Sequence, residues 1–464
     1  MRTIQTFNCR ENSLNTSTYT ISTQEELGET LAHAEAIHRS TVWQNQEVRK
    51  TFFTQLSACL LIQKSAIEEV YCSESSLSHE RFEREFQRTL NQLDAYINEG
   101  LNRLEECQRS ELSDRTLEKR WLPVGPVAVF GASNFPLAYG TLGGDALGAL
   151  AAGCPVIVKG HPLHAGTSSL LAQIAHEVLA AMELPKGIFG HVLDDGFALG
   201  CSLIQDARIK AGAFTGSQSG GMALTKLAQD RKHPIPFFAE MGSLNPVIFS
   251  NNCSNKTALL SALAKAVTED AGQFCTKPGI LFVPSEAAQA MEQAFKILLK
   301  DQPSHPMLHP SIYEKYCARL EALENQGVKV TRFKAELPWH ADRAFTSITF
   351  EQLLQTDALH HEVFGPFTCL VSYEYLTQVE ALLASIGGQL TVTLIGTSVE
   401  IEPLKQIAQR FCGRMIINGV PTGVVVDPAM HHGGPFPSSS DARFTSVGED
   451  SLKRFIRPFC LQKN

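Results

Sequence analysis

Apolar side chains in the first hundred residues recur at intervals of three or four, which is the spacing of one face of an α-helix. Two such stripes stand out: Phe52, Leu56 and Leu60, and then Phe82, Phe86, Leu90, Leu93 and Ile97. Gly100 follows the second stripe and is a suitable helix stop. We therefore expect this region to be helical, with both stripes in the core.

The pattern changes after Trp121, where short apolar runs alternate with longer helical patterns. The runs lie at 127–129, 156–158, 187–192 and 213–214, and the helical patterns at 142–152, at 168–182 and from Gly196. Strands that alternate with helices of this length are typical of βαβ units and a mostly parallel sheet. We expect a nucleotide-binding α/β domain over about 120–240, although the GxGxxG phosphate turn is absent.

A second α/β segment follows over about 243–435, with helical patterns near 256–267 and 286–299. The tail from Phe436 is rich in proline and serine and ends in the apolar run RFIRPFCLQ. An apolar terminal strand left alone is an aggregation edge, so we expect it to pair with another subunit. The fold class is thus α/β, with more than one domain.

Composition excludes several classes of protein. Hydrophobic residues make up 44% and charged residues 19% of the 464 residues, which is typical of a globular chain and not of a disordered or coiled-coil one. The formal net charge of -8 argues against nucleic acid as a partner. The apolar stretch 137–158 contains Asp145, several glycines and a proline, so we expect no membrane span there.

The twelve cysteines are scattered and form no CxxC pair. This usage is typical of free thiols in a reducing compartment. Since the N-terminus also lacks the apolar run of a secretory signal, we expect a cytoplasmic protein. Neither a third ligand at helical spacing nor an HExxH pattern accompanies the three histidine pairs, His161/His164, His360-His361 and His431-His432. We interpret them as surface or packed imidazoles and predict no metal site.

One cysteine has a setting that suits chemistry. Cys275 lies in GQFCTKPG, between Gly272 and a Pro-Gly turn, whereas the other eleven cysteines occupy positions typical of packing. A nucleophilic thiol needs a base, because its ordinary pKa of about 8.5 leaves little thiolate at neutral pH. Glu240, in FFAEMG, is the candidate, since burial raises a carboxyl pKa toward the useful range. On local sequence alone, a solvent-facing Glu240 and a Cys275 without function stay open.

Six short motifs resemble the aldehyde dehydrogenase superfamily in identity, order and spacing. They are ASNFP (132–136), VIVK (156–159), FTGS (214–217), EMG (240–242), GQFC (272–275) and EVFGP (362–366). Three longer stretches look like the 2,5-dioxovalerate (α-ketoglutarate semialdehyde) dehydrogenase branch: 74–93, KGHPLHAGTS (159–168) and 418–448. The resemblance implies an aldehyde dehydrogenase-like fold, with a Rossmann-type cofactor domain, an α/β catalytic domain and a small oligomerisation element.

The resemblance implies catalytic roles for three residues. Cys275 would attack the aldehyde carbon to give a thiohemiacetal, and Asn134 would hold the oxyanion together with the Cys275 backbone N–H. Such a donor is typically worth about 2.7–4 kcal/mol in the transition state. After hydride transfer to the nicotinamide, Glu240 would activate the water that hydrolyses the thioester. Apart from the resemblance, Asn134 reads as an ordinary turn residue.

The resemblance also places the cofactor. Lys159 would reach the adenosine ribose, and Gly216 and Ser217 would open a helix whose N–H groups face the pyrophosphate. Glu362 and Phe364 would position the nicotinamide ribose and ring. Apart from the resemblance, Lys159 and Glu362 read as ordinary solvated charges.

One departure from the family pattern bears on the choice of cofactor. Many NAD-specific members carry a glutamate three residues after the strand-end lysine, and Pro162 occupies that place here. No carboxylate then repels a 2′-phosphate, and Lys159 and His161 favour one. We therefore expect NADP as the cofactor, with NAD as the alternative.

The resemblance divides the chain into a cofactor-binding domain (1–112 and 126–242), a catalytic domain (243–435) and an oligomerisation element with the C-terminal tail (113–125 and 436–464). We expect a homodimer or homotetramer that acts on a small-molecule aldehyde, with 2,5-dioxopentanoate oxidised to 2-oxoglutarate. Two alternatives stay open: a fatty or medium-chain aldehyde dehydrogenase, and a catalytically silent relative kept for binding or structure.

Overall fold

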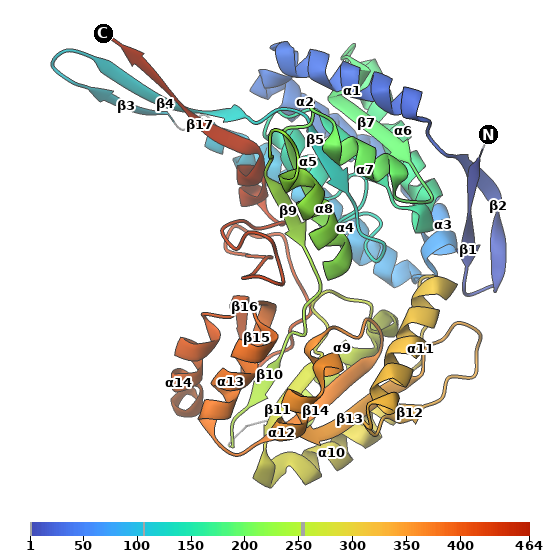
Figure 1. Cartoon of the computed structure of the whole chain (residues 1–464). Helices are drawn as coiled ribbons and strands as arrows, with labels where there is room; N and C mark the ends of the chain where they lie inside the picture. Colours follow the sequence, from blue (N-terminus) through green and yellow to red (C-terminus); the bar gives the residue numbers. More distant parts are fainter. Residues whose placement is uncertain (1, 105–106, 252–255) are drawn as a thin grey trace.

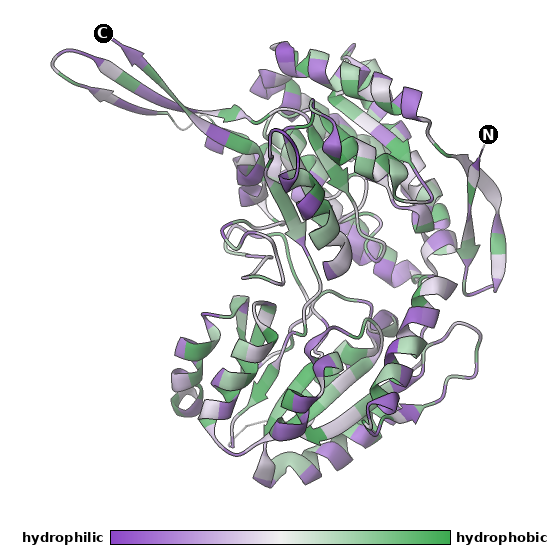
Figure 2. Cartoon of the chain, in the orientation of Figure 1, coloured by the Kyte–Doolittle hydropathy of each residue, from purple (hydrophilic) through white to green (hydrophobic). Residues whose placement is uncertain are grey.

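The computed structural model describes residues 2–104, 107–251 and 256–464. Cys253, one of the cysteines assigned to packing, lies outside these ranges. Within them the strands form four sheets: one of five strands, one of seven, a three-stranded sheet that extends from the body, and a hairpin (Figure 1). Strands of the two large sheets are mostly hydrophobic and buried (Figure 2), as expected for sheets covered on both faces.

The five-stranded sheet is parallel throughout. Its strand order is β7 (Phe189–Leu193), β6 (Val156–Gly160), β5 (Val127–Phe130), β8 (Ala211–Thr215) and β9 (Phe237–Glu240). Its helices are α5 (Gly144–Ala151), α6 (Ala165–Ala181), α7 (Ala198–Gln205) and α8 (Gln218–Gln229). The alternating pattern after Trp121 is therefore confirmed. No helix in the described ranges is long and apolar enough to cross a membrane.

The N-terminal region packs against this sheet. It consists of the hairpin β1 (Thr3–Asn8) and β2 (Ser13–Thr20), which the sequence did not predict, and the helices α1 (Gln24–Arg39), α2 (Gln46–Ile62), α3 (Lys64–Ser75) and α4 (His79–Ala95). Both apolar stripes are buried as predicted, except that Ile97 is half-buried in a π-helical turn beyond α4. A second, polar face of α4 carries Arg81, Glu85, Arg88 and Gln92 at helical spacing.

The seven-stranded sheet contains one antiparallel pair, β12 with β13. Its order is β12 (Thr331–Phe333), β13 (Arg343–Thr349), β14 (Phe367–Tyr373), β11 (Ile280–Pro284), β10 (Val247–Phe249), β15 (Gln389–Ile395) and β16 (Cys412–Ile417). Its helices are α9 (Lys256–Thr268), α10 (Ser285–Lys300), α11 (Pro310–Asn325), α12 (Phe350–Gln355), α13 (Leu376–Ile386) and α14 (Ser398–Ala408). The two helices predicted here, α9 and α10, are confirmed within a few residues.

The C-terminal apolar run is a strand, as predicted, and its partner lies in the same chain. β17 (Ile456–Lys463) pairs with β4 (Thr116–Pro123), which pairs with β3 (Gln108–Glu111), and this antiparallel arm extends from the body (Figure 1). Cys460 on β17 and Cys107 just before β3 are exposed. Their assignment to packing is wrong, because a single thin sheet provides no interior.

Candidate active site

The loop that carries Cys275 follows α9 and turns through the left-handed region. Asp270, Ala271 and Gly272 have φ angles of 48°, 55° and 64°, and this conformation costs a non-glycine residue about 1–2 kcal/mol. The buried guanidinium of Arg81 donates to Asp270, with Nη1 2.8 Å from Oδ2. The ion pair therefore connects the polar face of α4 to the turn that presents the thiol.

Two asparagines hold the backbone around the thiol. Nδ2 of the fully buried Asn245 donates to the carbonyl oxygens of Cys275, at 2.8 Å, and Lys277, at 3.0 Å. Nδ2 of Asn134 donates to the Gln273 carbonyl at 2.9 Å. Asn134 thus lies beside the nucleophile loop. Asn245 carried no signal in the sequence, because its contacts are made only in the folded chain.

Three reactive side chains converge at this loop. Glu240 lies at the end of β9, while His432 and Ser446 come from the C-terminal segment 418–448. His432 Nε2 lies 2.9 Å from Glu240 Oε1 and 3.6 Å from Cys275 Sγ. The Ser446 hydroxyl donates to Glu240 Oε2 at 2.8 Å. The imidazole is therefore within reach of both the thiol and the carboxylate, and Glu240 and His432 are buried.

The surroundings shift two pKa values in opposite directions. Burial and the charge of Glu240 raise the pKa of Cys275 well above its ordinary value, so the resting form is the thiol. Burial also raises the pKa of Glu240, but His432 and the Ser446 hydroxyl outweigh burial and the pKa lies below its ordinary value. Our expectation of a raised Glu240 pKa is therefore wrong, since burial here comes with two partners that favour the charged form.

His432 is a candidate that sequence reasoning missed. We interpreted His431-His432 as surface or packed imidazoles. This interpretation fits His431, which is half-buried, but it is wrong for His432, which is buried and contacts Glu240. The signal was its position in segment 418–448, which resembles the semialdehyde dehydrogenase branch. This segment is fixed to α4, because the Gln92 side chain accepts from the Gly448 N–H at 2.9 Å and donates to its carbonyl at 3.1 Å.

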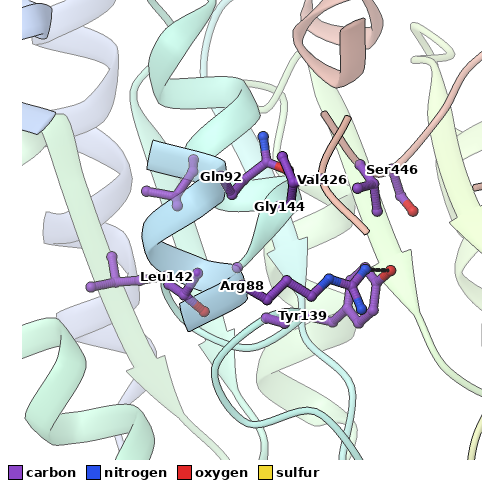
Figure 3. Close-up of a pocket in the computed structure, with 12 residues that line it drawn as sticks. Arg88, Gln92, Tyr139, Leu142, Gly144, Val426 and Ser446 are labelled. Atoms are coloured by element: carbon purple, nitrogen blue, oxygen red, sulfur yellow. Dashed lines mark hydrogen bonds between the residues drawn. The ribbon is translucent and has the colours of Figure 1, made fainter. Parts of the chain in front are cut away.

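Aromatic and aliphatic side chains form an apolar wall beside the thiol. The wall consists of Phe135, Tyr139, Phe274 and Val447. The Arg88 guanidinium lies 4.7 Å from the centroid of the Tyr139 ring and donates to the Tyr139 hydroxyl, and the Tyr139 ring is 5.8 Å from the His432 ring. Figure 3 shows Arg88 and Tyr139 meeting in a pocket that Ser446 also lines. Two guanidinium groups therefore border the apolar wall: Arg88 over Tyr139, and Arg81, paired with Asp270, over Phe135 and Phe274.

The loop that carries Glu362 and Phe364 is packed against the nucleophile loop. A Cβ on Gly272 would lie 2.5 Å from the Gly365 carbonyl oxygen, so the two loops touch backbone to backbone. A Cβ on Gly242 would lie 2.2 Å from Glu362 Oε2. Glycine at both positions therefore makes room for the approach, and Phe364 is half-buried in the same loop.

Glu362 is a second carboxylate near the thiol; it is half-buried, and its surroundings differ from those of Glu240. Burial raises the pKa of Glu362 to about 7, although Lys277 acts in the opposite direction. Burial lowers the pKa of Lys277 to about 8, and its Nζ donates to the Phe367 carbonyl at 2.7 Å. Oε1 of Glu362 is buried without a hydrogen-bond partner among the described residues.

The predicted cofactor residues of the five-stranded sheet lie at its carboxyl edge. Lys159 ends β6 and donates to the Asp194 carbonyl at 3.1 Å. His161 accepts from the Leu163 N–H at 3.2 Å, and burial, with His164 and Lys159, places its pKa well below the ordinary value. A ring that stays neutral offers hydrogen bonds but no charge. His161 therefore does not supply the positive charge that we expected to favour a 2′-phosphate.

Gly216 and Ser217 open α8, as predicted. The Ser217 hydroxyl caps the helix by accepting from the Gly220 N–H at 3.2 Å. β6 and β8 flank β5 on opposite sides, so Lys159 and Ser217 lie at the point where the strand order reverses, which is where parallel α/β sheets bind nucleotides.

Comparison with known proteins decides the family. The profile of the aldehyde dehydrogenase family matches residues 2–457. The chain belongs to the aldehyde dehydrogenase family. It is 39% identical over 360 residues to alpha-ketoglutaric semialdehyde dehydrogenase 2 of Azospirillum brasilense, covering 75% of this chain and 68% of that one. It is 36% identical over 446 residues to alpha-ketoglutaric semialdehyde dehydrogenase of Acinetobacter baylyi, covering 90% of this chain and 82% of the relative.

Solved structures show the same fold. Betaine aldehyde dehydrogenase of Staphylococcus aureus, in a complex with NAD⁺, superposes with a TM-score of 0.86 at 18% identity, covering all of this chain and 93% of that one. The 1-pyrroline-5-carboxylate dehydrogenase of Thermus thermophilus gives a TM-score of 0.88 at 17% identity and covers all of this chain and 90% of that one. The aldehyde dehydrogenase-like fold expected from the motifs is confirmed.

An NAD(P)-dependent aldehyde dehydrogenase needs a dinucleotide site, and the described residues fit one. The buried Oε1 of Glu362 has no partner, so it is free to accept from ribose hydroxyls, and an orphaned buried acceptor is costly unless a ligand satisfies it. The capped N-terminus of α8 at Ser217 suits a pyrophosphate. The ammonium of Lys159 lies at the same sheet edge.

Proposed function

We propose that this aldehyde dehydrogenase oxidises 2,5-dioxopentanoate, which is α-ketoglutaric semialdehyde, to 2-oxoglutarate with NADP. The observation that carries the chemistry is the contact of His432 Nε2 with both Cys275 Sγ and Glu240 Oε1. The substrate is supported by two relatives at 36% and 39% identity that carry the corresponding name. A fatty or medium-chain aldehyde is not favoured by those relatives, and the reactive groups in contact argue against a silent relative.

In the first step, His432 accepts the proton of the Cys275 thiol, and the thiolate sulfur attacks the aldehyde carbon. The imidazolium that forms is stabilised by the neighbouring Glu240 carboxylate, whose Oε1 lies 2.9 Å from His432 Nε2. The aldehyde oxygen becomes an oxyanion. The Asn134 amide and the Cys275 backbone N–H are the donors we assign to it, and preorganised donors of this kind are worth about 2.7–4 kcal/mol.

A bound nicotinamide would supply the hydride acceptor that oxidises the Cys275 thiohemiacetal to a thioester. We assign Glu362 and Phe364 to its ribose and ring, Gly216 and Ser217 to the pyrophosphate, and Lys159 to the adenosine ribose. The orphaned acceptor of Glu362 and the helix N-terminus at Ser217 support these assignments.

In the last step, water attacks the thioester carbon, and the Cys275 thiolate leaves. We assign Glu240 as the base that accepts a proton from this water. The Ser446 hydroxyl, at 2.8 Å from Oε2, orients the carboxylate. The lowered pKa of Glu240 makes it a weaker base than we expected, so the contribution of His432, close enough to share the proton, becomes part of the proposal.

The preference for NADP is supported by Pro162, which leaves no carboxylate beside the adenosine ribose, and by Lys159. Pro162→Glu would introduce that carboxylate. Two like charges about 4 Å apart interact by about 4 kcal/mol at an effective dielectric near 20, before screening. We expect the ratio of kcat/KM for NADP to that for NAD to exceed one in the wild type and to fall by one to two orders of magnitude in the variant. A ratio below one in the wild type would contradict the preference.

We also propose that the arm formed by β3, β4 and β17 is the oligomerisation element of a homodimer or homotetramer. Since β3 (Gln108–Glu111) lies in the range 1–112, this proposal moves the start of the element ahead of residue 113. The outer edge of β17 has no strand partner among the described residues, and such edges are normally covered. Light scattering should show a dimer or tetramer for the intact chain and a monomer after truncation at Phe455. We also propose a cytoplasmic location, because the scattered cysteines are typical of free thiols in a reducing compartment.

The substrate is tested with a panel of aldehydes assayed at 340 nm with both cofactors. We expect kcat/KM for 2,5-dioxopentanoate to exceed that for pentanal and hexanal by at least about tenfold. A steep rise from hexanal to decanal would instead identify a fatty-aldehyde enzyme, and no turnover of any aldehyde would identify a silent relative. Cys275, Glu240 and His432 lie close enough together to bind a zinc ion. We assign them to acid–base chemistry without a metal, so activity should survive treatment with EDTA.

A further inference from the structure

Two arginines near the nucleophile have no acidic partner. Arg88 on α4 is half-buried, lies over the Tyr139 ring and donates to the Tyr139 hydroxyl (Figure 3). Arg414 on β16 lies under the segment 418–448, where it contacts Pro421 and Met430. No Asp or Glu among the described residues lies within ion-pair distance of either guanidinium.

Two buried arginines elsewhere in the chain are paired with carboxylates. Arg81, on the same face of α4 as Arg88, lies 2.8 Å from Asp270, and Arg454 lies 2.7 Å from Asp145. A buried charge without a counter-charge is costly, because water is lost and nothing replaces it. A bound anion would therefore offset the cost of an unpaired cation close to a catalytic group.

Both cations act on the catalytic groups. The charge of Arg88 lowers the pKa of Cys275 and of Glu240 against the larger effect of burial. Burial lowers the pKa of Arg414, and the charges of Cys275 and Tyr139 oppose that change. Nε of Arg414 is buried without a hydrogen-bond partner among the described residues. Both guanidinium groups are therefore close enough to the thiol to interact with its charge, and Arg414 keeps an unused donor.

We propose that Arg88 binds the carboxylate of the aldehyde substrate and that Arg414 supplies a second cation to the same carboxylate. The proposal rests on the proposed function. An extended five-carbon chain places its carboxylate carbon about 5 Å from its aldehyde carbon, given four bonds of about 1.5 Å. The methylene groups then pack against Phe135 and Phe274 of the apolar wall. The Arg88 guanidinium, 4.7 Å from the centroid of the Tyr139 ring and 5.8 Å from that of the Phe135 ring, suits an oxo-acid and disfavours a long alkyl chain.

The test is a ratio measured in the holoenzyme. We compare kcat/KM for 2,5-dioxopentanoate with kcat/KM for pentanal, which has the same length and no carboxylate. In Arg88→Gln the ratio should fall by about 10- to 100-fold, mainly through a higher KM for the oxo-acid, because a charge-assisted hydrogen bond to a carboxylate is lost. Arg414→Gln should lower the ratio in the same direction, and Arg88→Lys should restore part of it.

Arg84→Gln is the matched control. Arg84 lies one turn earlier on α4 and is exposed, with Nη2 3.0 Å from Glu269, so removing its charge should leave the ratio unchanged. The role of each arginine is overturned separately if its glutamine variant slows both substrates equally. If Arg88→Gln does not fold, the test uses Arg88→Lys and measures the inhibition constant of 2-oxoglutarate against pentanal oxidation. Arg88→Lys should bind this product several-fold less tightly than the wild type does. A wild type that does not prefer the oxo-acid would contradict the proposed substrate itself.

Discussion

Two glutamates lie close to Cys275, Glu240 buried and Glu362 half-buried, and their different surroundings shift their pKa values in opposite directions. Glu240 meets His432 and Ser446, and its pKa lies below the ordinary value. Glu362 has only the opposing charge of Lys277 to offset burial, and its pKa rises to about 7. Burial raises the pKa of both, so the number and geometry of the partners decide the outcome.

The comparison assigns different tasks to the two regions. A carboxylate whose charged form is favoured can stabilise an imidazolium and accept a proton from water, which is the work proposed for Glu240. A carboxylate that titrates near neutrality and keeps a free oxygen can exchange its state when a ligand supplies hydroxyl donors, which is the work proposed for Glu362. The following predictions test that distinction, beginning with Cys275, which lies close to both glutamates.

Replacing the nucleophile should have the largest effect. Cys275→Ala removes the sulfur that forms both covalent intermediates, so kcat should fall by at least about a thousandfold. Cofactor binding, followed by the change in intrinsic fluorescence on titration, should stay within a few-fold of the wild type. Substantial residual kcat would show that neither glutamate serves a thiol at all.

Glu240→Gln should slow hydrolysis of the thioester more than its formation. The amide cannot accept a proton from water, and loss of a general base costs about 100-fold or more. Rapid mixing should therefore show a burst of reduced cofactor followed by a slow steady rate. If the burst disappears together with the steady rate, Glu240 serves the first step or holds the site together.

His432→Gln should reduce the reactivity of Cys275 at neutral pH, measured as the rate of alkylation by iodoacetamide. The thiol pKa is raised, so the thiolate and the alkylation rate increase as pH rises. Without the imidazole the rate at pH 7 should fall by about tenfold or more, and the difference should shrink at high pH, where hydroxide removes the proton.

The matched control for this measurement is the adjacent histidine. His431 is half-buried and does not contact Glu240 or Cys275, so His431→Gln should alkylate like the wild type. Equal rates in all three proteins would show that His432 does not accept the thiol proton.

Glu362 should make cofactor binding depend on pH, with the smallest effect of the series. Its pKa is raised to about 7, so the carboxylate takes up a proton as pH falls through 7 and loses its capacity to accept from ribose hydroxyls. The cofactor KM should therefore rise by up to about tenfold between pH 8 and pH 6. Glu362→Gln should give a pH-independent and higher KM.

The exposed Glu336 provides the control for that profile, because Glu336→Gln should keep the dependence of the wild type. A wild-type cofactor KM that does not change between pH 6 and pH 8 would remove the contrast between the two glutamates. A pH dependence that is lost only in Glu362→Gln would show that the charge state of Glu362 controls cofactor binding.

Residues with a local signal were predicted, and residues without one were not. Cys275 and Glu240 lie in short motifs at a loop and a strand end, and the structure brings their side chains together. His432 has no neighbour in sequence that explains it, since its partner Glu240 is almost two hundred residues earlier. Arg88 and Asn245 likewise look like ordinary helix and loop residues until the fold places them.

The sequence by itself determined the helices and strands that carry a clear apolar pattern, because such patterns are local properties of the chain; the β1–β2 hairpin carries none and was not predicted. It also determined the family, because six motifs in one order carry more information than any one of them. Only the tertiary structure decided the charge of each buried group. A pKa depends on solvation and on partners within a few ångströms, and the partners of Glu240, His432 and Glu362 come from distant segments of the chain.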